Sequence, residues 1–161
     1  MFLYPKPLVA ALNGHAIAGG CMLALACDGR VMAAGKAKIA LNEITFGSTI
    51  FAGSTEMLRF WVGSAAATKI LCSGAMFPAE EAQRLGLVDE VQPEAAVLDR
   101  ARQVASDLAS RSASAFASIK SLLRRPAVEE MRRREQESLR EFVEIWYSAA
   151  TRERLREIRI L

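Results

Sequence analysis

The feature that most constrains this chain is an apolar segment, interrupted by glycines, between Leu8 and Cys27. Its first apolar run, from Leu8 to Leu12, has strand character and ends at the turn signal of Asn13 and Gly14. A stretch of small residues then leads into CMLALAC, which is apolar on nearly all sides and is typical of a short buried helix. A strand, a tight turn and a buried helix in this order favour an α/β fold.

The next part of the chain predicts two more short strands and then helices. The strands are expected over 30–34 and 37–41, although runs this short resemble buried helix in their periodicity. The pattern then becomes helical, with Ser54 expected to cap a helix that ends at Gly63. A second helix is expected over 64–71.

The second half of the chain is predicted to be mainly helical. Pro78 followed by AEEAQRLG marks a helix whose glutamates favour the positive N-terminus and which stops at Gly86. Leu87, Val88 and Val91 favour a short strand after it. Longer helical patterns fill the remainder, over 94–123 with a break near 110–114, and over 127–158 after Pro126, which is expected to stop one helix or start the next.

Composition limits the class of protein further. The 161 residues are 52% hydrophobic and 24% charged, which suits one domain with a substantial core. Three cysteines, an odd number without metal-like spacing, argue against a disulfide scaffold and a zinc module, and indicate a reducing, cytoplasmic compartment. Lys6 and its flanking prolines interrupt the first apolar run, so no signal peptide is predicted, and no stretch reaches the roughly 18 apolar residues of a membrane span.

The charge is weakly basic and carried mostly by arginine. Of the 21 basic residues 16 are arginine, against 18 acidic residues, which suits phosphate or carboxylate partners rather than nucleic acid. Ten arginines and eight glutamates fall between Arg124 and Arg159, where a solvated, salt-bridged helix face is the simpler interpretation. His15, the only histidine, and the cysteines are expected to be structural, and no metal site is predicted.

Two features could carry chemistry. Ala18-Gly19-Gly20 opens the apolar helix, where unpaired N–H groups and the helix dipole could stabilise an oxyanion; close packing of a turn against a strand is the alternative. Glu43 lies among Leu41, Ile44 and Phe46 in ALNEITFG, where apolar surroundings would raise its pKa and suit it to acid–base work. A surface glutamate at a strand end is the alternative there.

Three blocks in order, KPLVAALNGHAIAGGCMLALACD, KIALNEITFG and SGAMFPAEEAQRLGLVDEV, resemble the enoyl-CoA hydratase/isomerase (crotonase) superfamily. The resemblance implies a partial crotonase-like ββα spiral over 1–92 and a helical trimerisation region over 93–161. It also implies an acyl-CoA thioester as substrate, an enolate intermediate, and no cofactor other than the coenzyme A of the substrate. By position, Gly19 matches an oxyanion donor and Glu43 a catalytic glutamate.

One departure from the family pattern decides which reaction is expected. Hydratases of the superfamily carry a second glutamate directly after Gly-Gly-Cys, where this chain has Met22. Methionine cannot accept a proton or orient a water molecule for hydration. Met22 and the single LNE glutamate are similar to Δ3,Δ2-enoyl-CoA isomerases, which need one base to move a double bond. The resemblance also implies substrate contacts from Gly20, Met22, Ile44, Phe46 and Phe51, with Ile50 part of the pocket.

The family pattern has an N-terminal region before the Lys-Pro segment, which holds the other oxyanion donor. We therefore expect a truncated form, a separate chain that supplies this half, or loss of the reaction. The alternatives to an isomerase are another enolate reaction of the superfamily and a catalytically dead acyl-CoA-binding or assembly protein. The apolar faces with Phe142, Val143 and Trp146 predict a homo-oligomer, a trimer or hexamer by resemblance, or a complex with an N-terminal-half partner.

Overall fold

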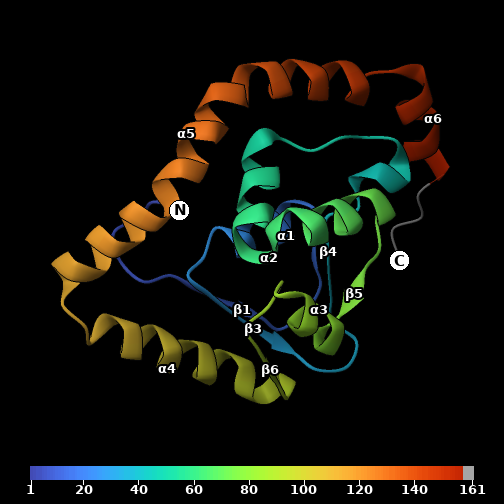
Figure 1. Cartoon of the computed structure of the whole chain (residues 1–161). Helices are drawn as coiled ribbons and strands as arrows, with labels where there is room; N and C mark the ends of the chain where they lie inside the picture. The colour runs from blue at the N-terminus through green and yellow to red at the C-terminus, as the bar shows by residue number, and fades with distance from the viewer. Residues whose placement is uncertain (158–161) are drawn as a thin grey trace.

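The fold consists of two three-stranded sheets wrapped by helices, and the computed structural model describes residues 1–157 (Figure 1). One sheet has the order β1-β3-β6 and is parallel throughout. The other has the order β2-β4-β5, with β2 parallel and β5 antiparallel to the middle strand. The strands are β1 (Val9–Leu12), β2 (Ala16–Ile17), β3 (Gly29–Ala33), β4 (Lys38–Ala40), β5 (Phe77–Pro78) and β6 (Glu90–Gln92).

The first four strands alternate between the two sheets, which produces the repeating ββα pattern. β1 and β2 are followed by α1 (Gly19–Leu25), and β3 and β4 by a 3-10 turn, η1 (Glu43–Phe46), and α2 (Ala52–Ser73). β3 is the central strand of its sheet and is buried at all five residues, as a parallel strand covered on both faces must be. The strands predicted over 30–34 and 37–41 are confirmed within one residue at each end.

The α2 helix differs from the sequence prediction at its start. Ser54 does not cap it: the N-cap is Phe51 and makes no side-chain capping bond, and Ser54 lies in the first turn. The N–H of Ala52, the first residue of α2, instead donates to Ser138 Oγ at 3.2 Å. A residue 86 positions away therefore provides an acceptor for the N-terminus of the helix. The predicted boundary at Gly63 is a kink inside α2, where φ is 76° and ψ is 165°.

The helix predicted after Pro78 is confirmed as α3 (Ala79–Leu85). Its N-cap is Pro78, Glu80 and Glu81 lie in the first turn, and the C-cap Gly86 has φ 79°, the left-handed conformation that glycine adopts without strain. The strand after it is β6, which begins two residues after Val88.

The C-terminal helices are η2 (Glu94–Ala96), α4 (Val97–Ala109), α5 (Ala113–Trp146) and α6 (Ala149–Glu157). The break near 110–114 is confirmed, but Pro126 neither stops nor starts a helix, because α5 continues through it. A proline removes a single N–H donor, and α5 is held by tertiary contacts on both sides of Pro126. Residue 158 of the predicted last helical region lies outside the described residues.

The α5 helix is fastened to the core by a buried ion cluster. The Asp28 carboxylate accepts hydrogen bonds from Lys120 Nζ at 2.7 Å and from the Leu8 N–H at 2.8 Å, and it pairs with Arg124 Nη2 at 2.9 Å. Arg124 is 3% exposed and also donates to the carbonyls of Phe2, Ala26 and Cys27, the last two directly after α1. Arg124 is therefore not on the solvated arginine face that the charge pattern predicted.

In Figure 1, α5 runs from the lower left to the top of the view, and α6 turns down on the right. In this view α5 and α6 together pass around the outside of α2, and α4 lies along the sheet of β1 and β3. None of the helices within residues 1–157 combines the length and apolar character needed to cross a bilayer.

Candidate active site

The turn before α1 has an unusual backbone geometry. Ala18 has φ 50° and ψ −116°, the one non-glycine residue with positive φ in the described part of the chain. Its N–H donates to the Ala40 carbonyl at 2.8 Å, which pins the turn to β4. A residue held in this region costs about 1–3 kcal/mol and is found most often at functional sites.

Gly19 and Gly20 begin α1 and are exposed. A Cβ atom added to either would have no described heavy atom outside its local backbone within 4 Å, so packing against a strand does not explain these glycines. The N–H of Gly19 has no carbonyl four residues earlier within the helix. No hydrogen bond donated by this N–H is found within residues 1–157, so it can donate to a ligand, as an oxyanion site requires.

Glu43 begins η1, three residues after the end of β4, and it is only 5% exposed. Its Oε2 has no hydrogen-bond partner among the described residues, and neither has Oδ1 of Asn42. Burial raises the pKa of the Glu43 carboxyl, and a hydrogen bond with its own backbone opposes part of that rise. The alternative of a surface glutamate is therefore wrong, and the group is suited to proton transfer.

Glu43 and the Gly19 turn lie at the same edge of one sheet. In the parallel β2–β4 pair, Ile17 is opposite Ala40, so the residues that follow each strand leave the sheet at the same end. The pKa of the Cys21 thiol in α1 is raised to about 12, first by burial and second by the charge of Glu43. This coupling indicates that the carboxylate lies near the first turn of α1.

Several of the residues predicted to contact substrate line two neighbouring cavities. Glu43, Ile44 and Ile50 line one of about 270 Å³. Met22 and Phe51 line the other, of about 520 Å³, between α1, α2 and α5. Gly20 and Phe46 line neither, and Phe46 packs edge to face on Trp146 with ring centroids 6.2 Å apart.

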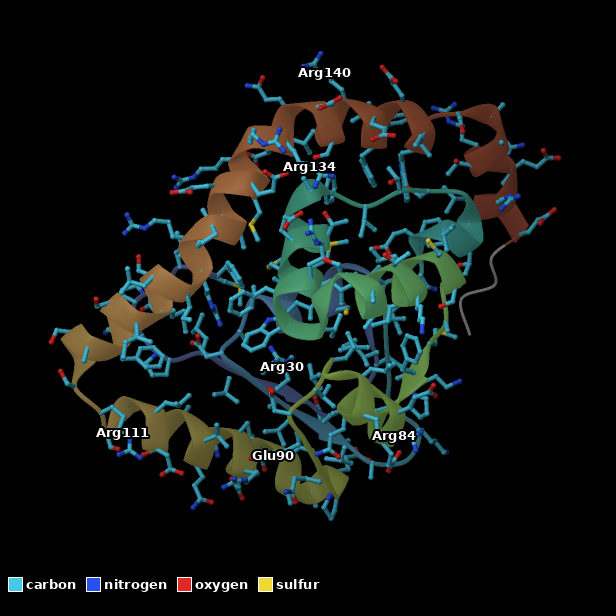
Figure 2. The ribbon with its side chains drawn as sticks, viewed as in Figure 1. Arg30, Arg84, Glu90, Arg111, Arg134 and Arg140 are labelled. Carbon is cyan, nitrogen blue, oxygen red and sulfur yellow. The ribbon has the colours of Figure 1, made fainter. Side chains whose placement is uncertain are left out.

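Three residues of α5 that sequence reasoning missed line the Glu43 cavity: Arg134, Ser138 and Glu141. Ser138 also lines the second cavity, so its hydrogen bond to the Ala52 N–H lies between the two. Arg134 pairs with Glu56 of α2 at 3.1 Å, and Figure 2 shows it where α5 passes over α2. No local sequence pattern predicts these contacts, because they join segments more than 75 residues apart in sequence.

The apolar face expected to be free for oligomer contacts is partly used within the chain. Phe142 packs on Phe51, with ring centroids 4.4 Å apart, and stacks on Trp146 at 5.6 Å. Val143 remains 49% exposed.

The remaining sequence candidates are structural or peripheral. His15 Nδ1 accepts a hydrogen bond from the Lys38 N–H at 3.2 Å. Cys21 and Cys27 are buried as expected, but Cys72 is exposed and lines the Glu43 cavity, so the expectation that all three pack is wrong for it. Residues 1–157 contain no cluster of three or more His, Cys, Asp or Glu side chains that could hold a metal ion.

A family model described as enoyl-CoA hydratase/isomerase matches residues 1–156. The 2,3-dehydroadipyl-CoA hydratase of Escherichia coli (strain K12) is 43% identical over 121 residues, which make up 75% of this chain and 47% of that protein. An enoyl-CoA hydratase/isomerase structure from Pseudoalteromonas atlantica T6c has a TM-score of 0.85 at 27% identity and covers 94% of this chain and 61% of its own. The Mtb enoyl-CoA isomerase structure has a TM-score of 0.77 at 29% identity, with shares of 98% and 62%.

The chain spans about half the length of the curated relatives it matches.

Proposed function

We propose a function from the premise that this chain belongs to the enoyl-CoA hydratase/isomerase family: it moves the double bond of a 3-enoyl-CoA thioester to the 2-position through an enolate. The predicted fold is confirmed, since the solved structures of the family share this ββα arrangement and its C-terminal helices. One observation carries the reaction. The buried carboxylate of Glu43, whose Oε2 has no hydrogen-bond partner within residues 1–157, lies at the same sheet edge as the N–H of Gly19.

Glu43 acts as the single base and acid. It removes a proton from C2 of the substrate, and the electron pair moves through the carbonyl to give an enolate. The same carboxyl group then returns the proton at C4, which leaves the double bond between C2 and C3. The raised pKa of Glu43 supports this role, because a carboxyl group whose pKa is closer to neutral pH can both accept and return a proton.

Gly19 supplies one of the hydrogen bonds to the thioester oxygen. Its N–H stands at the start of α1, where the helix dipole adds partial positive charge. Loss of one such donor costs about 3–4 kcal/mol of transition-state stabilisation in a typical oxyanion site. The second donor would come from a further segment or a partner chain, and coenzyme A would be the only cofactor-like group involved.

Met22 separates this proposal from a hydration reaction. Several relatives are named hydratases, including the Escherichia coli protein, so the family alone does not select the reaction. Met22 stands one turn into α1 and has no group that could activate water. A single carboxylate is sufficient for a proton shuttle between C2 and C4.

The acyl part of the substrate would lie along the two cavities. Gly20 and Met22 would border the thioester, and Phe51 would border the acyl chain. Ile44 would lie beside the Glu43 base, and Phe46 would support η1 through its packing on Trp146. We propose that the protein works as a homo-oligomer, a trimer or hexamer, or with an N-terminal-half partner. Val143 and the other exposed apolar residues of α5 would contribute to that contact.

A second candidate function is binding of acyl-CoA without turnover. It is favoured by the fact that the chain spans about half the length of its relatives, whereas turnover through an enolate uses a second hydrogen-bond donor besides Gly19.

The test is the isomerisation of a 3-enoyl-CoA, followed by absorbance of the conjugated product, in wild type, Glu43→Gln and a control, Glu137→Gln. Glu137 is an exposed carboxylate on α5 and lines neither of the two cavities. We expect Glu43→Gln to abolish the reaction while acyl-CoA binding persists, and Glu137→Gln to match wild type. Binding without turnover in all three proteins would support the second candidate, and near wild-type turnover by Glu43→Gln would refute the mechanism.

A further inference from the structure

A third cavity, of about 470 Å³, lies between the N-terminal segment Pro5–Pro7 and the junction of α4 with α5. It shares no lining residue with the two cavities of the candidate active site. Figure 2 shows one of its residues, Arg111, at the turn between α4 and α5, on the opposite side of the view from α6. The cavity is therefore separate from Glu43.

Both walls of this cavity are anchored. On one side, the Lys6 carbonyl accepts a hydrogen bond from the buried Lys120 at 3.4 Å, and the flanking prolines restrict the backbone. On the other side, Ser112 Oγ accepts from the Ala115 N–H at 3.4 Å and caps the start of α5. Anchored walls leave a preformed cavity, with a volume in the range of small-molecule sites, about 300–1,000 Å³.

The lining combines positive charge with an apolar interior. Lys6 and Arg111 are both exposed at the cavity, which no acidic residue lines, and neither forms an ion pair within residues 1–157. Phe116 is half-buried and presents an aromatic surface, and Leu108 adds to the apolar part. By contrast, Arg133 of α5 is paired with Glu130 at 2.8 Å.

We propose that this cavity binds a small organic anion with a flat apolar body, the chemistry shared by aromatic carboxylates and aromatic phosphates. The apolar body packs on Phe116 and Leu108. The anionic group meets Lys6 and Arg111, whose guanidinium can hold a carboxylate or a phosphate through two parallel hydrogen bonds. This binding is independent of the isomerase reaction.

The first experiment titrates the ¹⁵N-labelled protein with 1-naphthoate, 1-naphthyl phosphate and the neutral 1-naphthamide. We expect the two anions to shift the amide signals of residues 105–116, and the amide to bind at least about tenfold more weakly, because it lacks the charge-assisted hydrogen bonds. The stronger of the two anions identifies which group the site prefers. Equal binding of the neutral amide, or shifts confined to other parts of the chain, would overturn the proposal.

The second experiment uses charge-matched variants. Lys6→Ala/Arg111→Ala removes the two cations of the cavity, and Lys36→Ala/Arg102→Ala removes two exposed cations elsewhere, with the same change in net charge. We expect only the first variant to weaken binding of the anions, by about tenfold or more, with both proteins retaining the wild-type unfolding temperature. Equal weakening in both variants would mean that net charge attracts the anions, and the assigned site would be wrong.

Discussion

The ion cluster beneath α5 predicts a large loss of stability on substitution of Asp28 by Asn. Asn has nearly the same shape and can still accept the hydrogen bond from the Leu8 N–H. The substitution removes the carboxylate charge that pairs with both Lys120 and Arg124. Their side chains are only 5% and 4% exposed, so water cannot replace the lost partner.

The magnitude follows from the burial of the two cations. Removing one partner of a buried ion pair leaves an uncompensated charge and costs about 3–5 kcal/mol. For a chain of this size, each kcal/mol lowers the unfolding temperature by about 2–4 °C, so Asp28→Asn is expected to unfold about 6–20 °C below wild type. Arg124 retains the carbonyls of Phe2 and Cys27, which places the loss toward the lower end of the range.

Urea unfolding followed by far-UV circular dichroism measures this loss. The control is Glu90→Gln, which breaks an ion pair with Arg100 where both side chains are about one third exposed. Such a pair contributes about 0–1 kcal/mol, so the control should stay close to wild type. If Asp28→Asn lowered the free energy of unfolding by less than about 1 kcal/mol, the argument that burial makes this cluster important for stability would be refuted.

Three further predictions concern the candidate site. Because the pKa of Glu43 is raised in the folded state, its protonated form stabilises the fold at low pH and that contribution is lost as the pH rises; Glu43→Gln should therefore melt above wild type near about pH 8, with the gap closing near about pH 4 in thermal scans. Gly74→Ala should lower stability by about 1–3 kcal/mol in urea unfolding and slow isomerisation, because its φ is 59° and a Cβ would come within 2.6 Å of Thr45 in η1; an unchanged protein would contradict this. The wild-type chain should not hydrate crotonyl-CoA measurably by loss of enoyl absorbance, whereas fast hydration would show that Met22 does not limit the reaction.

Sequence patterns predicted the elements whose signals are local. The Pro78–Gly86 helix was predicted well, because a proline start, acidic first turn and glycine stop act within one segment. The capping role predicted for Ser54 was wrong, because Ser138 accepts the hydrogen bond from the first N–H of α2. No local sequence pattern contains this contact. Pro126 was misjudged for a similar reason, since tertiary contacts on both sides keep α5 continuous.

The candidate site shows the same division. Gly19 and Glu43 could be proposed from their motifs, but the burial of Glu43 and the position of the two residues relative to one another depend on the folded chain, the latter on the β2–β4 pairing. From composition, Glu43 could equally have been a surface side chain. The contribution of α5 to the cavity around it had no sequence signal at all.

The C-terminal helices also couple the stability of the fold to the candidate site. Beyond the Asp28 cluster, α5 and α6 contact the segment around Glu43 at two further points. Ser138 of α5 accepts a hydrogen bond from the first N–H of α2, and the Thr151 hydroxyl of α6 donates to the Gly47 carbonyl at 2.7 Å. Gly47 ends the 3-10 turn that Glu43 begins. If α5 detached, water would reach the Glu43 carboxylate and lower its pKa toward the ordinary value. The buried ions under α5 therefore help to maintain the desolvation on which the proposed proton transfer depends.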